Sequence, residues 1–553
     1  MRFDAIIVGA GHNGLVAANY LARAELKVLV CERRTMVGGA CVTEEFSPGQ
    51  SFSSCASVLS CLRSRILEEL QLERHGLDLY QTELALLALR DDGACLRIWP
   101  ALHRTLAEFD RLQAGDGDGF IDFGVTMRRF SSLMSPYLLA EPPTRAELQD
   151  AFLKAGEPEL FAQFFESSAN ALMERFFRGS LAKGAMSYLG LVGLHGGTHT
   201  LGSAYLVGHH AMGNFAGGLG GAFLARGGMG SVTTAMSRAA IAAGATIKTD
   251  SEVAQIIVDS GTAAGVVLRD GQRLLAPIIL SNADPHTTYL ELLSRDDLPV
   301  ATALAAEGID FRGAQARILL VTRELPLFVG QSPADLASRT AVTLLGPDID
   351  AYRRCGDASV GGELADDYPI ELLAQSATDK APGTHTVGLG IQQVPYQLRN
   401  GGWDERREEF TNTVLRSLFR YAPNLKDAVL QTFTLTPLDI ERRYGLYRGN
   451  QFHGTMVPSQ VLADRPFRNA CGYRTAIPGL YLCGAGTHPG GGVMGACGYN
   501  AANAVLRDLG VDSGSQVPNS LASDRMPDLV HRLATNPRLR RFRNWLLRRS
   551  WPR

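Results

Sequence analysis

The chain has 553 residues, too many for one ordinary core, and its 54 basic and 56 acidic side chains leave a formal net charge of -2. This length predicts about two to four domains, and the balanced charge gives no reason to expect a nucleic-acid partner. Nine cysteines without a C-x-x-C pair argue against a disulfide scaffold or a redox dithiol and favour reduced thiols in the cytoplasm.

The start of the chain predicts a strand, a glycine turn and a helix. The apolar residues 5–8 are followed by Gly9, Gly11 and Gly14 with the spacing G-x-G-x-x-G, and helical apolar spacing begins at Leu15. Such glycines allow the tight bend, the approach of backbone amides to a pyrophosphate, and close packing of helix on strand. Because structure is predicted from residue 4, we expect no signal peptide, and no run of about 18 apolar residues predicts a membrane span.

A second buried strand, predicted at residues 27–31, ends at Glu32, which lies 18 residues after Gly14. A carboxylate at this place binds the ribose hydroxyls of a dinucleotide. The turn and Glu32 together predict a Rossmann-type nucleotide site, and the alternative is an ordinary glycine-rich turn.

The next segment, ERRTMVGGA, resembles the E-x-R-x-x-x-G-G-R element of the large FAD-binding family that holds amine oxidases and carotenoid desaturases. The resemblance implies that Glu32 and Arg34 belong to the cofactor site and that Gly38 and Gly39 let the backbone approach the phosphates and the flavin. Ala40 replaces the final Arg of the element, which disfavours the amine-oxidase branch and leaves FAD as the favoured cofactor.

Residues 101–183 are mostly helical in pattern, and residues 184–225 then contain no Asp, Glu, Lys or Arg but 12 glycines and four histidines. This segment must be largely buried. With part of residues 300–435 it is a candidate wall of an apolar substrate cavity, and the alternative is an ordinary core crossing between domains.

His209 and His210 are the titratable groups of this segment that we place nearest the substrate. On a strand, adjacent side chains face opposite sides, so at most one of them would reach the flavin and no metal pair is expected. The alternative is that both are structural histidines.

Residues 227–230 open a helix that runs to about residue 243, and strand patterns with an Asp270-Gly271 hairpin turn then predict a β-meander. Val253, on this meander, aligns with the position whose backbone contacts adenine in the family.

Near the end, GLYLCGAGTHPGGGVMGA predicts a strand at 480–483, a turn at Gly484 and Ala485, and a helix beginning near Gly495. The segment resembles the family's C-terminal flavin-binding segment, and a helix N-terminus there would stabilise negative charge on the reduced ring. The alternative is a glycine-rich core crossing. His488 either lies close to the flavin or only anchors this loop.

The last residues predict a polar linker at 511–523 and a basic amphipathic helical tail at 524–553. Three alternatives stay open for the tail: contact with an anionic membrane surface, docking on its own domain, or a solvated terminus. The residues on which these alternatives rest are the cap Asn536, Pro537, the apolar face Leu539, Phe542 and Leu546, and the interfacial Trp545 and Trp551.

Taken together, these motifs resemble the phytoene desaturase-like FAD-dependent oxidoreductases. The resemblance implies an α/β fold with a Rossmann-type, glutathione reductase-like FAD-binding domain that carries a β-meander, plus a discontinuous α+β substrate domain. We expect residues 1–95, 222–300 and 445–510 in the first domain and residues 96–221 and 301–444 in the second.

The resemblance also implies hydride transfer between FAD and an apolar small molecule, through desaturation, saturation or isomerisation of a polyene or isoprenoid-like compound. The alternatives are a flavin-dependent amine oxidase and a flavin-binding regulatory protein without turnover. The electron acceptor stays open between oxygen, a quinone and a nicotinamide, and no catalytic acid or base is identified. The expected location is the cytoplasm, with membrane-surface contact through the tail as one alternative.

Overall fold

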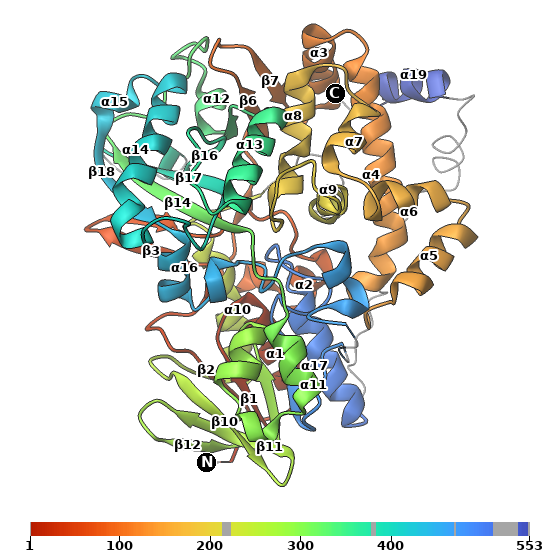
Figure 1. Ribbon diagram of the computed structural model, residues 1–553, viewed down its shortest axis with the longest axis vertical. Helices are drawn as coiled ribbons and strands as arrows, with labels where there is room; N and C mark the ends of the chain where they lie inside the picture. The colour runs from red at the N-terminus through yellow and green to blue at the C-terminus, as the bar shows by residue number, and fades with distance from the viewer. Residues whose placement is uncertain are drawn as a thin grey trace.

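The computed structural model describes residues 2–212, 223–377, 383–468, 470, 472–511 and 540–550. A parallel sheet lies at the end of the molecule that holds the N-terminus, and a larger sheet and a group of helices lie at the opposite end (Figure 1). No helix within these ranges is long and apolar enough to cross a bilayer.

The parallel sheet is assembled from distant parts of the chain. Its five strands, in spatial order, are β19 (Leu480–Leu482), β13 (Ile278–Ser281), β1 (Ala5–Val8), β2 (Val28–Cys31) and β9 (Thr246–Lys248). The central strand β1 pairs in parallel with both β13 and β2. All four of its residues are buried, as expected for a strand covered on both faces.

The two faces of this sheet have different covers, because alternate residues of a strand point to opposite sides. Ala5 and Ile7 pack on the helical side, whereas Ile6 and Val8 pack on the meander side. The covering helices are α1 (His12–Arg23), α10 (Gly230–Ala242) and α17 (Ala496–Asp508). The opposite face carries the antiparallel meander of β10 (Val253–Asp259), β11 (Thr262–Leu268) and β12 (Arg273–Leu275), which agrees with the predicted β-meander.

The larger sheet has seven strands and is antiparallel except for the parallel pair β15 and β6. Its order is β18 (Val429–Leu435), β14 (Ala314–Thr322), β17 (His385–Val394), β16 (Ile370–Ala374), β15 (Val342–Leu345), β6 (Leu86–Leu89) and β7 (Cys95–Ile98). The strands β6 and β7 correct one expectation. We placed residues 1–95 in the FAD-binding domain, but β6 and Cys95, the first residue of β7, pair within the larger sheet, because Leu87, Leu89 and Cys95 pack in the core of that sheet.

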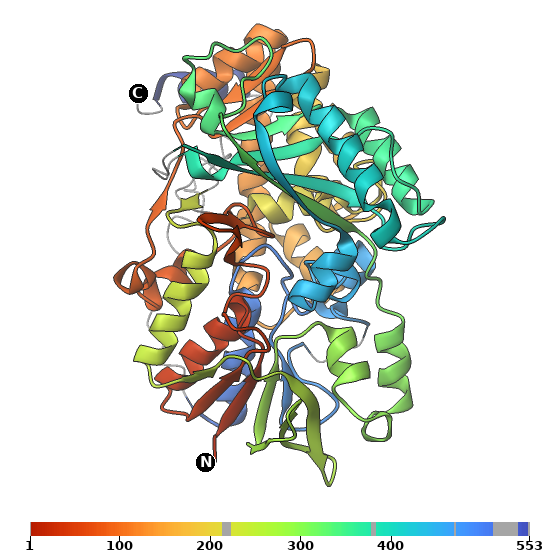
Figure 2. The ribbon, with the colours of Figure 1, turned by 90° about the vertical axis from the view of Figure 1, so that its left-hand side faces the viewer.

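Two sets of helices and two small two-stranded sheets complete the fold. The helices beside the larger sheet (Figure 2) are α12 (Leu336–Thr340), α13 (Ile349–Val360), α14 (Trp403–Tyr421), α15 (Leu425–Ala428) and α16 (Pro437–Tyr444). The separate helical group contains α3 (Leu102–Leu112), α4 (Asp116–Leu138), α5 (Arg145–Lys154), α6 (Pro158–Phe165), α7 (Ala169–Glu174), α8 (Ser180–Ser187) and α9 (Ser203–Ala211). The remaining elements are β3 (Thr43–Ser47), β4 (Gln50–Ser53), β5 (Leu79–Tyr80), β8 (Leu224–Ala225), α2 (Ser64–Glu69) and α11 (Val300–Glu307).

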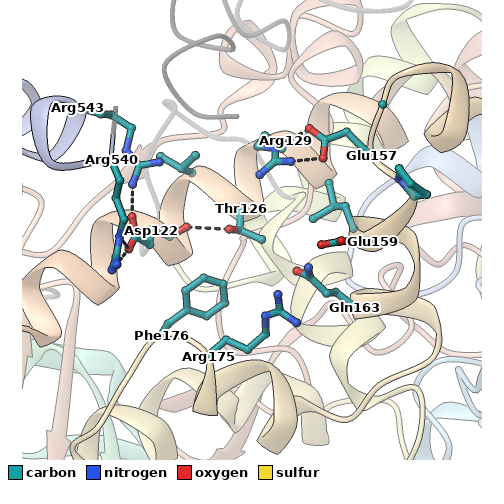
Figure 3. Close-up of a pocket in the computed structure, with 14 residues that line it drawn as sticks. Asp122, Thr126, Arg129, Glu157, Glu159, Gln163, Arg175, Phe176, Arg540 and Arg543 are labelled. Atoms are coloured by element: carbon teal, nitrogen blue, oxygen red, sulfur yellow. Dashed lines mark hydrogen bonds and ion pairs between the residues drawn. The ribbon is translucent and has the colours of Figure 1, made fainter. Parts of the chain in front are cut away.

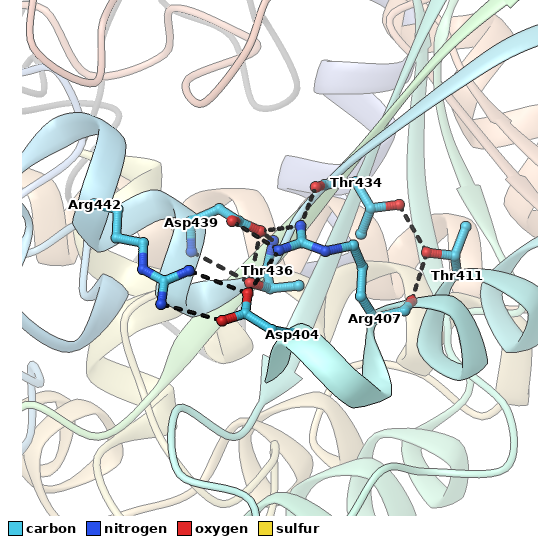
Figure 4. A network of polar contacts seen from close by, with 7 residues as sticks. All are labelled: Asp404, Arg407, Thr411, Thr434, Thr436, Asp439 and Arg442. Carbon is cyan, nitrogen blue, oxygen red and sulfur yellow. Dashed lines mark hydrogen bonds and ion pairs between the residues drawn. The ribbon is translucent and has the colours of Figure 1, made fainter. Parts of the chain in front are cut away.

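A polar network fixes α14 against α16 and β18 (Figure 4). Arg407 of α14 donates to Asp439 Oδ1 of α16 at 3.0 Å, and Asp404 accepts from Arg442 at 3.1 Å. Arg407 also donates to the carbonyl of Thr434 at 3.0 Å. These hydrogen bonds hold α14 against β18 of the larger sheet and against α16.

The C-terminal helix α19 (Arg540–Ser550) docks on α4. Arg548 donates to Asp118 at 2.9 Å and to Asp110 at 3.1 Å, and Arg540 and Arg543 pair with Asp122. Of the three expectations for the tail, the described helix therefore adopts the docked one. The linker residues 512–523 and the tail positions Asn536, Pro537, Leu539 and Trp551 lie outside the described residues, as do the side chains of Phe542 and Leu546.

Candidate functional site

The glycine turn after β1 is built as a nucleotide-binding turn. Gly9 has φ of +93°, a conformation that side chains rarely adopt, and a Cβ on Gly14 would lie 2.3 Å from the carbonyl oxygen of Gly9. A Cβ on Gly11 would lie 2.7 Å from Asn282 Nδ2, so the turn also packs tightly on the end of β13. No side chain caps α1 at Gly11, which leaves the helix N-terminus available for an anion.

Glu32 stands at the end of β2 and points toward this turn. Its side chain is buried, Oε2 accepts from the amide of Ala10 at 2.8 Å, and Oε1 accepts from the amide of Arg34 at 2.9 Å. Each carboxylate oxygen keeps a lone pair for a further donor. The geometry therefore suits the hydroxyl pair of a ribose.

Gly38 and Gly39 lie against the glycine turn. The amide of Gly38 donates to the carbonyl of Ala10 at 2.9 Å, and a Cβ on Gly39 would lie 3.4 Å from the Cα of Gly11. Both have positive φ, of +125° and +58°. A backbone that approaches the turn this closely can also approach a ligand held there.

Arg34 supplies a positive charge beside these glycines. It forms an ion pair with Glu44, and its guanidinium lies over the ring of Tyr444 at 5.2 Å from the centroid. Its Nη1 is buried and has no hydrogen-bond partner in the described chain. A ligand that brings an acceptor to this position would satisfy the buried guanidinium nitrogen.

Val253 begins the meander next to Glu32. The amide of Ser251 donates to the carbonyl of Glu32 at 2.8 Å, and the amide of Asp250 donates to the carbonyl of Arg34 at 3.0 Å. The backbone leading to Val253 is therefore attached to the ribose-binding end of β2. This is the side of the site where the resemblance placed adenine.

The C-terminal segment brings Gly484, Ala485 and Gly495 to the same place. The amide of Cys483 donates to the carbonyl of Ser281 at 2.8 Å, so the turn after β19 lies beside the end of β13. Gly495 caps α17 with φ of +75°, and a Cβ there would lie 3.4 Å from Val16 of α1. The two helix N-termini are thus neighbours, as the three motifs required.

Arg465 holds this turn in place, and sequence reasoning missed it. It is 1% exposed and donates to the carbonyl of Ala485 from Nε at 3.0 Å and from Nη2 at 2.8 Å. It also donates to the carbonyls of Phe452, Gly454, Thr455 and Gln460. Burial lowers its pKa to about 10, so the guanidinium stays charged at neutral pH. No motif marks it, because an isolated Arg in a loop carries no spacing signal.

His453 and His12 are two further groups that the sequence did not single out. Burial lowers the pKa of His453 to about 3 and that of His12 to about 4, so both are neutral at pH 7. Nδ1 of His453 has no partner in the described chain and lies 2.9 Å from where a Cβ on Gly484 would stand. His453 therefore faces the cofactor turn.

His209 and His210 lie on helix α9, and the expected strand is wrong. The segment forms a helix rather than a strand because Tyr205 and its neighbours fill the core between α4 and α6. Nε2 of His209 bonds to the carbonyl oxygen of Gly491 at 2.9 Å, in the loop before α17, whereas Nε2 of His210 bonds to the carbonyl oxygen of Val192 at 3.2 Å. Burial lowers the pKa of both, that of His209 to about 3. Only His209 reaches the cofactor loop.

His488 anchors its loop in the described structure. Its Nε2 lies 2.8 Å from the carbonyl oxygen of Tyr137 of α4, and burial lowers its pKa to about 4. The contact ties the loop after β19 to the helical group.

A pocket of about 530 Å³ lies elsewhere, between α4, α6 and α19 (Figure 3). Arg129 donates to Glu157 Oε1 at 2.8 Å on its edge, and the pairs of α19 with Asp122 close one side. Its charged lining does not fit an apolar substrate, and it is separate from the nucleotide site.

The residues present fit FAD. The N-terminus of α1, which has no side-chain cap in the described residues, suits the pyrophosphate, and the buried carboxylate of Glu32 suits the ribose. Arg34 Nη1 has no partner in the described chain and can donate to an oxygen of the cofactor. The second helix N-terminus, at Gly495, suits the flavin end, where it stabilises negative charge on a reduced ring.

The chain is similar to known proteins over most of its length. The chain is 34% identical over 545 residues to pyridine nucleotide-disulfide oxidoreductase domain-containing protein 2 of Rattus norvegicus, covering 92% of this chain and 94% of that protein. It is 27% identical to a limonene dehydrogenase component of Castellaniella defragrans, covering 95% and 98%. Phytoene desaturases are more distant relatives.

The fold also matches solved amine oxidases. A structure of cyclohexylamine oxidase from Brevibacterium oxydans superimposes with a TM-score of 0.53 at 17% identity, covering 92% of this chain and 100% of that one. The sequence model of the family described as flavin containing amine oxidoreductase matches residues 14–506. The chain belongs to that family and is an FAD-dependent oxidoreductase.

Proposed function

We propose that this oxidoreductase acts on C–H bonds of an apolar, isoprenoid-like substrate, through desaturation, saturation or isomerisation. FAD held at this site would supply the hydride-transfer chemistry, so the protein has mainly to orient the C–H bond of the substrate and exclude water. No charged catalytic group is required for that task.

The supporting observation is an apolar cluster on the larger sheet. Leu224 of β8 packs with Val342 of β15 and Leu373 of β16, and Val58 and Tyr80 border them. Val58 and Tyr80 come from the segment between Gly39 and β6, so the cluster joins that segment to the substrate-domain sheet. The names of two relatives, a limonene dehydrogenase component and a phytoene desaturase, both refer to hydrocarbons.

Anaerobic mixing of the flavin-loaded protein with limonene, with a linear polyene, with an isoprenoid alcohol and with putrescine tests the proposal. Loss of the visible absorption of oxidised flavin with one of the three apolar compounds supports desaturation, and a new product after incubation with the flavin-reduced protein supports saturation or isomerisation. Loss with putrescine alone would instead favour amine oxidation, and neither loss of absorption nor a new product with any compound would favour a binding role without turnover. Re-oxidation of the reduced protein by oxygen, a quinone or a nicotinamide then identifies the class of electron acceptor.

A further inference from the structure

A buried polar cluster of Arg317, Glu371 and Tyr188 lies on the larger sheet, on the face toward the nucleotide-binding domain. On β14, Ile318 and Leu320 pack in the core of the substrate domain, whereas Leu319 and Val321 pack against Phe52 and its neighbours. Arg317 lies two residues before Leu319 and therefore on the same face as Leu319. It points toward the segment that follows Gly38 and Gly39.

Arg317 is buried without a full set of acceptors. It is 3% exposed, its Nη1 lies 4.0 Å from Glu371 Oε1, and its Nε has no hydrogen-bond partner in the described chain. A buried guanidinium with an incomplete set of hydrogen bonds is costly. A ligand with a hydrogen-bond acceptor would satisfy the Arg317 guanidinium.

The neighbours of Arg317 hold it and Glu371 in place. Glu371 Oε1 accepts from Ser57 Oγ at 2.9 Å, which links the sheet to the cofactor segment. Gly390 lies opposite Arg317 on β17, and a Cβ there would stand 2.6 Å from Arg317 Nη1, so the glycine makes room for the guanidinium. These contacts hold Arg317 and Glu371 in a defined arrangement.

Tyr188 adds a second donor. Its hydroxyl is buried and lies near Gln392, Glu371 and Arg317. Burial and then the charge of Glu371 raise its pKa well above the ordinary value. The phenol therefore remains protonated and can donate.

The polar cluster borders the apolar cluster of the proposed function. Glu371 and Leu373 lie two residues apart on β16 and face the same side, and Leu373 packs with Leu224 and Val342. A ligand that covers the apolar residues can therefore place one end at Arg317.

We propose that Arg317 and Tyr188 bind a neutral oxygen atom of the substrate, so that the substrate is an oxygenated apolar molecule, an alcohol or a carbonyl compound, rather than a hydrocarbon. The charges of Arg317 and Glu371 cancel, and a carboxylate or an ammonium ion would add a buried charge without a partner. A hydroxyl or carbonyl oxygen accepts from both donors and adds no charge. This inference rests on the proposed function.

The test uses four probes with one C15 skeleton: farnesene, farnesol, farnesal and farnesoic acid. Calorimetric titration of the flavin-loaded protein should give dissociation constants for farnesol or farnesal at least about tenfold below those for farnesene and farnesoic acid. Arg317→Met should remove this preference and leave farnesene binding unchanged. Arg312→Met, at an exposed arginine nearby, is the matched control.

Tyr188→Phe provides a second variant that removes only a hydroxyl, so it tests the site even if Arg317→Met does not fold. It should weaken farnesol and farnesal binding but not farnesene binding. Equal binding of all four probes, tightest binding of farnesoic acid, or an unchanged preference in a folded Arg317→Met or Tyr188→Phe variant would overturn the polar site. Failure of every probe to bind would instead count against the proposed apolar substrate.

Discussion

The carboxylate of Glu32 accepts a hydrogen bond from the backbone amide of Ala10 at 2.8 Å, which joins the end of β2 directly to the glycine turn. A single side chain thus connects the phosphate-binding and ribose-binding parts of the cofactor site. The negative charge of Glu32 strengthens its hydrogen bonds with the two backbone amides and would strengthen those with the hydroxyls of a ribose.

Glu32→Gln should weaken FAD binding about 10- to 100-fold, because a charged acceptor for two amides and a ribose becomes a neutral amide. Fluorescence titration of the apoprotein with FAD measures the effect. The exposed Glu68→Gln serves as control and should bind FAD like the wild type. Unchanged FAD affinity in Glu32→Gln would show that the ribose is bound elsewhere.

Arg465→Met should lower the free energy of unfolding by at least about 3 kcal/mol, because five buried carbonyl groups lose a charged donor. The turn at Ala485 should loosen with it, so the purified variant should also retain less flavin. Urea unfolding and the flavin-to-protein absorbance ratio report the two effects. Arg468→Met, at an exposed arginine close by, should change neither.

Stability should fall on acidification because His209 is buried neutral. Its pKa is lowered from the ordinary 6.5 to about 3, so the unfolded chain binds a proton that the folded protein does not. The stability that depends on neutral His209 is fully present above the ordinary pKa. The free energy of unfolding then declines between pH 6.5 and about 3, by about 2 kcal/mol at a pH of about 5. Urea midpoints across this window should vary less in His209→Gln than in the wild type. The exposed His103→Gln should keep the wild-type pH dependence.

Asp122→Asn should release α19, because Arg540 and Arg543 both pair with this carboxylate. Hydrogen exchange at residues 540–550 should become at least about tenfold faster, a change of the size expected when a charged contact is lost. Asp150→Asn, at an exposed carboxylate paired with Lys154, is the control. Slow exchange in the Asp122→Asn variant would mean that apolar contacts, not the ion pairs, hold the helix.

The sequence signals that predict the nucleotide site are local. The spacing from Gly9 to Gly14, the distance to Glu32 and the strand before Gly484 each report a backbone requirement within a few residues. The structure brings these three segments together through the pairing of β1, β13 and β19.

The parts that the sequence missed depend on long-range packing. Arg465, His453 and Arg317 are each isolated in the chain, and their roles appear only when distant loops and strands meet around them. The strand expected at His209 failed for a related reason, since an all-apolar segment without charges fits a buried helix as well as a buried strand. Residues 86–95 were placed in the FAD-binding domain because the position of a segment along the chain does not identify the sheet with which it pairs.

The order of strands in the parallel sheet has a consequence for biosynthesis. β19 forms an edge of that sheet and α17 supplies the second helix N-terminus, yet both come from residues 480–508 of a chain of 553. A ribosome that has translated the first motif has made only a fraction of the cofactor site. FAD can therefore be held in full only after residue 508 has been translated, and fragments that end before residue 480 will lack part of its binding site.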